Sequence, residues 1–384
     1  MVVGAGPAGS TCATLLARTG VDVLLVEAGD FSRPRPGEVL APVTVRLLSE
    51  LGLPSPRSGC GAVVCRGILS AWSSLKPEFF DYELYTCSAG VTVDRRIFDI
   101  DLAASAVAAK ARLMKGGRLC RAEIRDRDRW DLLIEQAGQV ISVQADFLIE
   151  AVGRKGSFSA LSQRARTFYD RLVAVTIPHP SPGPDEGLLL LEAGRDGWWY
   201  SSRDVGKASS VVYLTDADLL PPASVARTQH LKDAYASTRL IRELLGAASD
   251  FHAHRVIDAR TSWRTVIGDH WLAIGDAAFA NDPLCGAGIR FALLSAEKAS
   301  RAVAAFLQDD KPRLFEEYAT WFALEVASQL HSKQNVYGSV RSELHRCVFW
   351  NRRFVTFRMP RSVISTRKDY SEHDAFRNQA VFQM

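Results

Sequence analysis

Apolar residues near the start of the chain follow the order expected of a strand, a glycine-rich turn, a helix and a second strand. Val2 and Val3 lead directly into the glycine-rich stretch 4–9, so either the first strand is very short or the chain begins a few residues upstream. Apolar positions at helical spacing predict a helix over 10–18. The nearly continuous apolar run 21–26 predicts a buried strand of a parallel sheet.

Further strands and helices are predicted along the rest of the chain. Helical patterns cover 41–51, 99–113, 225–245, 286–307 and a C-terminal stretch that begins at 313. Strand patterns cover 118–124, 130–136, 139–143, 147–149, 172–177, 187–192, 198–201, 209–214 and 271–274. Helices that alternate with buried strands near both ends, around a strand-rich middle, predict an α/β protein with an inserted β-sheet.

The composition limits the classes of function. With 384 residues, 47% hydrophobic and 23% charged, the chain can bury a large core. A net charge of +4 is too small an excess to indicate a nucleic-acid partner. No apolar run reaches the roughly 20 residues that span a bilayer, so we expect a soluble protein without a membrane span. The arginine-rich stretch 352–367 is interpreted as a solvated face or a set of ion pairs, with a docking patch for an acidic partner as the alternative.

Cysteine usage indicates the compartment. The seven cysteines are odd in number, scattered and never spaced as C-x-x-C. This pattern predicts a reducing, cytoplasmic environment and no metal site. His252 and His254 are expected to alternate along a strand and are interpreted as surface or core residues, because no third ligand stands at a suitable spacing.

The stretch 4–9 matches the dinucleotide-binding pattern G-x-G-x-x-G. Gly4 makes the tight turn, Gly6 lets the backbone approach a pyrophosphate, and Gly9 allows close contact between helix and strand. The first turn of the following helix then presents free N–H groups and the positive end of its dipole to the phosphates.

Two further features of this region identify the nucleotide. Glu27 follows the next strand, close to the ~20-residue offset of an acid that binds ribose hydroxyls. Pro7 and Ala8, inside the glycine pattern, favour FAD.

A second glycine-rich region lies near residue 275. Gly275-Asp276 follows a predicted strand, and the Asp276 carboxylate is expected to reach ribityl or pyrophosphate oxygens; the alternative is a helix cap. Downstream, a turn opens the long helix, whose N-terminus would face the flavin ring where negative charge collects on reduction. The residues of this turn expected at the cofactor are Pro283, Gly286, Gly288 and Ile289.

These motifs, together with Asp94-Arg95, resemble those of flavoprotein monooxygenases of the para-hydroxybenzoate hydroxylase type over nearly the whole chain. The stretches 37–40, 197–200 and 349–353 resemble one branch of that family. The branch contains flavin-dependent tryptophan halogenases and the flavoproteins that hydroxylate protein-bound tryptophan during maturation of quinone cofactors. The resemblance implies that Arg95 touches the FAD phosphate or ribityl region and that Glu38 lies beside the flavin.

The same resemblance implies a division into domains. A Rossmann-like FAD-binding domain is expected over 1–60, 90–165 and 255–310. An inserted mixed β-sheet over 61–89 and 166–254 forms the substrate domain, and a helical C-terminal segment covers 311–384. Arg154, near the end of the second FAD segment, is expected to be a structural ion-pair partner.

The implied reaction is oxygen transfer to an electron-rich indole or phenol, either a small molecule or a tryptophan within a peptide or protein. Electrons would come from NAD(P)H, directly or through a separate flavin reductase. The candidate catalytic residues are Glu38, Lys76 and Trp199, with Trp198 weighed evenly against Trp199, and no catalytic base is visible.

Halogenation is the first alternative. The Trp-x-Trp-x-Ile-Pro signature of halogenases is absent from this sequence, and Lys76 is the only lysine near the stretch where halogenases carry the residue that receives hypohalous acid. An FAD-dependent reductase of the same fold is the second alternative, and a flavin-binding protein without turnover is the third.

Overall fold

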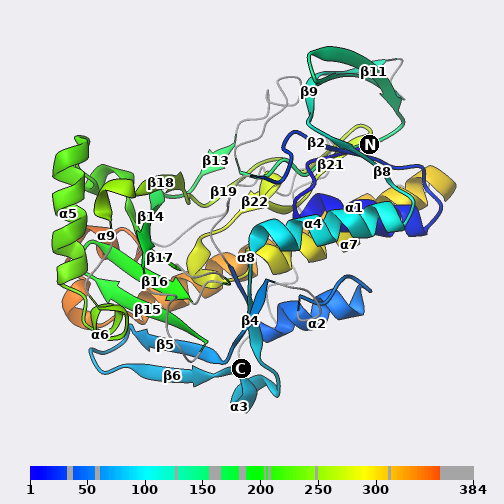
Figure 1. Ribbon diagram of the computed structural model, residues 1–384. Coiled ribbons are helices and arrows are strands. Elements are labelled where there is room, and N and C mark those ends of the chain that lie inside the picture. The colour runs from blue at the N-terminus through cyan, green and yellow to red at the C-terminus, as the bar shows by residue number, and fades with distance from the viewer. Residues whose placement is uncertain are drawn as a thin grey trace, which may run out of the picture.

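The computed structural model describes residues 1–32, 38–56, 61–125, 129–154, 166–180, 187–202, 205, 209–246, 250–309 and 313–354. These residues form several β-sheets covered by helices, which confirms the predicted α/β class (Figure 1). No helix within these ranges is both long and apolar enough to cross a lipid bilayer. Gly37 and the part of the arginine-rich stretch beyond 354 lie outside the described residues.

A six-stranded sheet holds the N-terminal motif. Its order is β20-β21-β12-β1-β2-β8, and all neighbours pair in parallel except β20 with β21. The first strand has only two residues, yet it lies between β2 and β12 in the middle of the sheet. The strands are β1 (Val2–Val3), β2 (Leu24–Glu27), β8 (Arg112–Lys115), β12 (Leu148–Glu150), β20 (Ile267–Gly268) and β21 (Trp271–Ala273).

Three helices pack together beside this sheet. Helix α1 (Pro7–Arg18) lies between α4 (Arg95–Ala108) and α7 (Gly288–Asp309), and α8 (Arg313–Gly338) packs on α7 (Figure 1). The side chains that α1 turns toward the sheet are small or apolar, which allows the helix to approach the strands closely.

An antiparallel meander covers the end of the parallel sheet. Strands β9 (Gly117–Arg125), β10 (Arg129–Gln136) and β11 (Gln139–Ala145) pair in sequence, and their apolar side contributes Leu132 to the core of the parallel sheet. The predicted hairpin through Ala137 and Gly138 is confirmed.

The inserted sheet is mixed, as predicted. Its order is β18-β14-β17-β16-β15-β5-β6, and β15 pairs with β5 in parallel while the other neighbours are antiparallel. One face packs on α5 (Ser224–Ala236) and α6 (Leu240–Leu245), and the other packs on the end of α8 and on α9 (Val348–Asn351). The strands are β5 (Gly67–Ala71), β6 (Glu78–Asp81), β14 (Leu172–His179), β15 (Leu188–Gly194), β16 (Gly197–Ser202), β17 (Ser209–Asp216) and β18 (Arg255–Asp258).

Two small sheets join these layers. One contains β3 (Glu38–Leu40), β7 (Gly90–Val93) and β4 (Ala62–Cys65), and packs near α2 (Pro42–Glu50). The other contains β13 (Thr167–Phe168), β19 (Ser262–Trp263) and β22 (Phe279–Ala280). Strand β4 lies in the expected substrate segment 61–89 but pairs with β7, which lies in the expected FAD-binding segment 90–165. Strand β18 lies in the expected FAD-binding segment 255–310 but belongs to the inserted sheet.

Two predicted helices end earlier than expected. The helix over 99–113 is wrong beyond Ala108, because the chain turns at Lys110, whose φ is +77°, and Leu113 then pairs with β2. The helix over 225–245 is broken into α5 and α6. At the break, the buried Glu192 carboxylate accepts the N–H groups of Arg239 and Ile241 at 2.7 and 3.0 Å, which begins a new helix.

Other differences concern short elements. Strands β4 and β5 were not predicted, because their segment shows no clear alternation. The strand expected at the two histidines is also wrong. His252 lies in a single 3-10 turn, η2 (Phe251–Ala253), and β18 begins only at Arg255. The expectation of ion pairs is met at Arg352 and Arg353, which pair with Asp216 on β17.

Candidate functional site

The dinucleotide turn, Gly4–Gly9, joins β1 to α1 and depends on the absence of side chains. Gly4 has a φ of +102°, and a Cβ there would lie 2.4 Å from the carbonyl oxygen of Ala151. A Cβ on Gly9 would lie 1.8 Å from the carbonyl oxygen of Gly4. At Gly6, by contrast, no described atom lies within 4 Å of the corresponding position. The turn is therefore packed on its inner side and open at the glycine that is expected to meet a pyrophosphate.

The start of α1 faces this open side. Gly6 is the N-cap residue, Pro7 is the first helical residue, and no described side chain caps the helix. The first N–H groups of a helix have no partners within it, so Ala8 and Gly9 can donate to an anion, whereas Pro7 has no N–H. A pyrophosphate fits this position.

Glu27 lies at the end of β2 and contacts the same turn. Its carboxylate accepts the N–H of Ala5 at 2.7 Å and the N–H of Gly29 at 2.8 Å. These contacts fix the carboxylate beside the turn, where an acid would bind ribose hydroxyls. The ribose contact itself stays a prediction.

The structure brings Glu38 and Arg95 together. Arg95 Nη1 donates to Glu38 Oε2 at 2.5 Å, and Nε lies 3.3 Å from Asp99 Oδ1. Burial alone would lower the pKa of Arg95, but the two carboxylates outweigh it and raise the pKa. The pairing of β3 with β7 places Glu38 opposite Val93, two residues before Arg95, which explains the contact.

Gly275 brings the second motif to the first. Its φ is +55°, and a Cβ there would lie 2.7 Å from the side chain of Ala8 on α1. Asp276 follows within the short turn η3 (Gly275–Ala277), and its side chain is 34% exposed. A partly exposed carboxylate beside the start of α1 fits the expected contact with ribityl or pyrophosphate oxygens.

Three arginines surround this turn. Arg154 Nε lies 3.2 Å from Asp276 Oδ2, so the expected ion pair of Arg154 is formed with the candidate flavin ligand itself. Arg166 and Arg264 donate to the carbonyl oxygen of Ala277 at 3.0 and 2.8 Å. Burial and the nearby Arg264 charge lower the pKa of Arg166 to about 10.

Arg264 also forms a buried ion pair with Glu150, at the end of β12. The sequence analysis did not identify this pair or the role of Arg166. A charged residue directly after a buried apolar strand was the available signal for Glu150.

The second motif continues into the 282–288 loop, which precedes α7. Asp282 begins the short turn η4 (Pro283–Cys285) by accepting the N–H of Leu284 at 3.0 Å, and Gly286 has a φ of +57°. Gly288 is the first residue of α7, and no described atom would meet a Cβ there or at Gly286. Ile289 is buried against α2, which anchors the start of the helix.

Cys285 lies inside this loop in surroundings that disfavour its thiolate. Burial and the neighbouring Asp282 carboxylate raise its pKa to about 12. Because the thiolate is the nucleophilic form, the side chain acts as a small packing residue.

Beside the loop lies a buried polar group that the sequence analysis missed, the lysine cluster, which consists of Asp170, Thr261, Asp282, Lys333 and Tyr337. Lys333 Nζ donates to Asp170 Oδ2 at 2.6 Å and to Thr261 Oγ1 at 2.7 Å. It also lies 3.4 Å from Asp282 Oδ2, which accepts the Tyr337 hydroxyl at 2.8 Å. The available signal was a lysine on the apolar side of α8, which also carries Phe322, Val326, Leu330 and Tyr337.

The two tryptophans of β16 point to opposite faces of the inserted sheet. Both are 1% exposed, and Trp199 stacks on Tyr213 in the core beneath α5 and α6, on the face away from the 282–288 loop. The catalytic role of Trp199 stays a prediction that this position does not favour. Trp198 lies on the other face, where Leu284 of the 282–288 loop packs against the same cluster. Its Nε1 donates to the Tyr337 hydroxyl at 3.1 Å.

Lys76 makes no side-chain contact with these groups among the described residues. It is exposed in the turn between β5 and β6, and β6 is the outermost strand of the inserted sheet (Figure 1). Ser74 Oγ donates to the Lys76 carbonyl oxygen at 2.9 Å and accepts the Lys76 N–H at 3.1 Å, and these contacts shape the turn. The position is typical of a solvated surface lysine.

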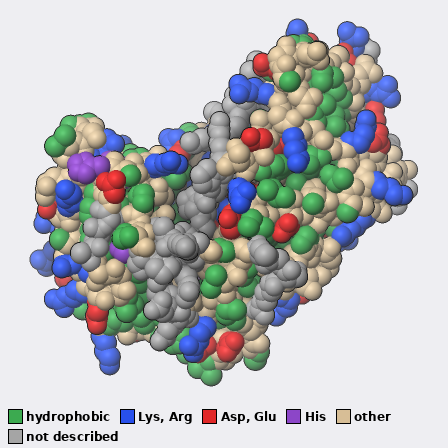
Figure 2. Space-filling view, in the orientation of Figure 1, with side chains coloured by type: hydrophobic (Ala, Val, Ile, Leu, Met, Phe, Trp, Pro, Cys, Tyr) green, Lys and Arg blue, Asp and Glu red, His purple; other side chains and the backbone are tan. Residues whose placement is uncertain are grey.

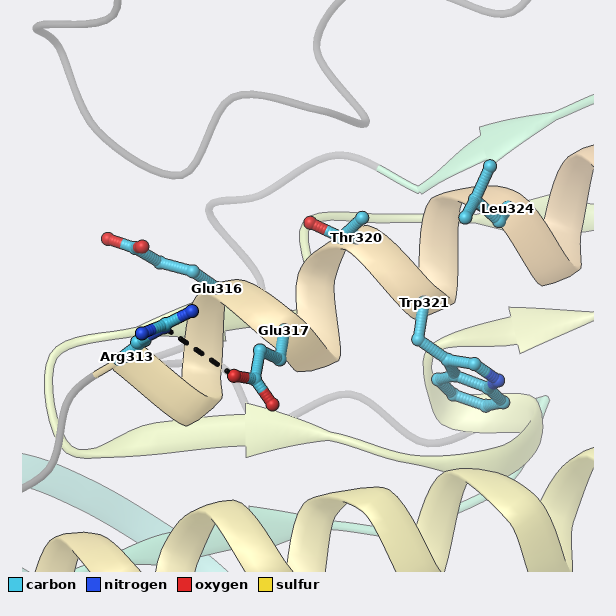
Figure 3. Close-up of a pocket in the computed structure, with 6 residues that line it drawn as sticks. All are labelled: Arg313, Glu316, Glu317, Thr320, Trp321 and Leu324. Atoms are coloured by element: carbon cyan, nitrogen blue, oxygen red, sulfur yellow. Dashed lines mark ion pairs between the residues drawn. The ribbon is translucent and has the colours of Figure 1, made fainter. Parts of the chain in front are cut away.

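A shallow cavity of about 470 Å³ lies on the outer face of α8, apart from the groups above (Figure 3). Trp321 and Leu324 form its apolar part, and Arg313 pairs with Glu317 across one turn at 3.6 Å. On the face seen in Figure 2, described basic and acidic side chains are interspersed. Among the described residues no group of three His, Cys, Asp or Glu side chains is arranged to hold a metal.

Comparison with known proteins decides the family. The model of the family described as "FAD binding domain" matches residues 1–332. The chain belongs to this family. It is a flavin-dependent enzyme with FAD as its cofactor, and the resemblance stated from the motifs is confirmed.

Individual relatives span much of the chain. A putative FAD-dependent oxidoreductase, LodB from Marinomonas mediterranea, is 28% identical over 333 residues, which are 83% of this chain and 89% of LodB. Tryptophan 2-halogenase from Chondromyces crocatus is 27% identical over 79% of this chain, which spans only 60% of that enzyme.

Two solved structures share the fold. The flavin-dependent halogenase CmlS has a TM-score of 0.81 and 23% identity, covering 93% of this chain and 67% of CmlS. The peptidyl tryptophan dihydroxylase QhpG, described as essential for tryptophylquinone cofactor biogenesis, has a TM-score of 0.76 and 24% identity, covering 92% of this chain and 77% of QhpG.

Proposed function

We propose that this flavoenzyme is a monooxygenase that hydroxylates an electron-rich aromatic ring, with a tryptophan held in a peptide or protein as the preferred substrate. One atom of O2 is inserted into a ring C–H bond and the other leaves as water. The two electrons come from NAD(P)H, directly or through a flavin reductase. FAD supplies the oxygen chemistry, and the protein binds, orients and shields it.

The residues of the dinucleotide turn, with Glu27 and Asp276, hold the cofactor in this proposal. The inner side of the turn is closed by backbone contacts and its outer side is open, which fits a pyrophosphate at Gly6. Gly275 lies against Ala8, so the acid of the second motif is next to the same helix start. Arg95, held by Glu38, is the candidate contact to the ribityl or phosphate groups.

The observation that carries the substrate class is the face of β16 that bears Trp198. Trp198 and Tyr200 lie 5.8 Å apart by ring centroids, and Leu284 of the 282–288 loop packs against the same cluster. Trp198 is 1% exposed and covered by the end of α8 and by α9, so it supports the loop from within the core. Tyr200 is only partly buried and is the candidate contact for a flat, electron-rich ring. The similarity to a peptidyl tryptophan dihydroxylase supports a tryptophan within a peptide.

Oxygen transfer is favoured over halogenation by Lys76. A lysine that receives hypohalous acid must lie in an enclosed passage between flavin and substrate, whereas Lys76 lies in an exposed turn next to the outermost strand.

The test is NAD(P)H-dependent O2 uptake with added flavin reductase, chloride or bromide, and a panel of free tryptophan, phenols and tryptophan-containing peptides, followed by mass analysis. We expect a gain of oxygen, and Lys76→Ala should retain it. A gain of halogen that Lys76→Ala abolishes would establish the halogenase, and a gain of two hydrogens would establish a reductase. Activity on free aromatics alone would refute the peptide substrate.

A further inference from the structure

Lys333 is a buried cation that the proposed reaction does not use. Its side chain is 4% exposed, and it comes from the C-terminal part of α8. Its Nζ contacts Asp170, before β14, and Thr261, before β19. The third contact, with Asp282 at 3.4 Å, reaches the 282–288 loop. One ammonium group therefore joins three segments that are far apart in the sequence.

Asp282 links this cation to the inserted sheet. It is 2% exposed, and its Oδ1 accepts the N–H of Leu284 and so sets the shape of the loop. Its Oδ2 accepts the Tyr337 hydroxyl, which in turn accepts the indole N–H of Trp198 on β16. A continuous series of hydrogen bonds therefore joins Trp198 on β16, through Tyr337, to Asp282, the first residue of the loop.

The charges of the cluster depend on one another. Burial would lower the pKa of Lys333, but the Asp282 and Asp170 carboxylates outweigh it and raise the pKa, so the amine remains protonated. Removing one member of such a group leaves a buried charge without its partner, which is far more costly than losing an exposed pair. The position of the 282–288 loop therefore depends on all the contacts of the lysine cluster.

We propose that Lys333 and Tyr337 are positioning residues for the 282–288 loop, and that they make its place beside the flavin ring depend on the Trp198 face of the inserted sheet. The inference rests on the proposed location of this loop at the flavin. It deepens that proposal, because the aromatic cluster of the inserted sheet is connected through named hydrogen bonds to the loop expected at the cofactor.

Tyr337→Phe is the sharpest test, because it removes one hydroxyl and leaves the charges intact. Tyr235→Phe is the control. Tyr235 lies on α5, on the other face of the same sheet, is 4% exposed, and donates one hydrogen bond, to the Gly246 carbonyl oxygen at 2.9 Å. The measurements are the visible absorption and fluorescence of bound FAD, the FAD dissociation constant, and urea unfolding of the apo-protein.

We expect Tyr337→Phe to lose more apo-protein stability than Tyr235→Phe, because its hydroxyl makes two hydrogen bonds, one of them to a carboxylate. Tyr337→Phe alone should also shift the flavin spectrum and weaken FAD binding roughly 3- to 10-fold, the factor that one ordinary hydrogen bond represents. Lys333→Met should change the spectrum further, and Lys333→Arg should restore part of it.

A wild-type spectrum and affinity in Tyr337→Phe, or equal changes in Tyr235→Phe, would overturn the positioning role while leaving the FAD site intact. A spectral shift confined to Tyr337→Phe would support that role even if no aromatic product is found. The two proposals therefore fail separately.

Discussion

The dinucleotide turn and the lysine cluster are two ends of one candidate site that are built in opposite ways. The turn uses backbone and the absence of side chains: a Cβ at Gly9 would lie 1.8 Å from a carbonyl oxygen, while the space at Gly6 is open. The cluster uses buried side-chain charges, with Lys333 only 4% exposed between two aspartates. The open space at Gly6 determines what can bind at the dinucleotide turn. The balance of buried charges around Lys333 determines the shape of the loop at the lysine cluster.

The difference predicts two kinds of sensitivity. A backbone-built turn responds mainly to added volume, because its glycines carry no titrating group and its one carboxylate contact is Glu27, through the Ala5 N–H. A buried ionic cluster responds to lost charge and to protonation. The effects of variants at the dinucleotide turn and at the lysine cluster can therefore be ranked by size and distinguished by their pH dependence.

The largest effect is expected for Gly9→Ala. The added methyl group would collide with the Gly4 carbonyl oxygen, which is backbone and cannot move without opening the turn. We expect the free energy of unfolding to fall by at least about 3 kcal/mol, together with loss of FAD. Urea unfolding and flavin content measure both. Gly338→Ala is the control, since no described atom lies within 4 Å of a Cβ there; an equal loss in the two variants would contradict the role of close packing.

Asp170→Asn tests the ionic end and its pH dependence. Burial raises the pKa of Asp170, but the Lys333 charge outweighs burial and holds it below the ordinary value of 3.8. The folded-state pKa lies below the unfolded one, so Asp170 stabilises the fold above about pH 4 and this contribution is lost as the pH falls further.

We expect Asp170→Asn to be less stable than wild type by roughly 3 kcal/mol at pH 7, with the difference narrowing below pH ~4. Urea unfolding at neutral and acidic pH measures it. Asp22→Asn is the control, because that side chain is 79% exposed in its pair with Arg112. A difference that does not change with pH would contradict the ionic account.

Gly6→Val should separate binding from folding. The branched side chain would fill the open space at the turn, so we expect soluble, colourless protein with FAD affinity reduced at least about 100-fold, or about 2.7 kcal/mol. The free energy of unfolding of the apo-protein should stay close to the wild-type value. Normal flavin content in this variant would remove the pyrophosphate assignment.

The smallest effect is expected at Glu38 and Arg95. The pair is partly exposed, at 38% and 16%, so solvent weakens it. A double-mutant cycle of Glu38→Gln and Arg95→Gln, followed by urea unfolding, should give a coupling energy of about 1 kcal/mol. The exposed pair of Asp22 and Arg112 should give a coupling near zero. A stronger coupling there than at Glu38 and Arg95 would contradict this ranking.

Local patterns predicted the parts of the fold that are contiguous in sequence. The dinucleotide turn, the helix after it and the 137–138 hairpin were all predicted. Local patterns failed where the chain changes direction inside an apolar stretch, as at Lys110, or where a distant side chain begins a helix, as Glu192 does for α6.

The sequence alone determined the FAD family, because a glycine pattern, an acid at a set offset and a Gly-Asp motif are short-range features whose geometry follows from backbone sterics. Only the tertiary structure decided which tryptophan faces the 282–288 loop, because neighbouring residues of a strand alternate and the packing of whole helices selects the face. It also decided that Lys333 is buried between Asp170 and Asp282, 163 and 51 residues away in the chain. Contacts over such separations depend on the assembled sheets, and no local pattern encodes them.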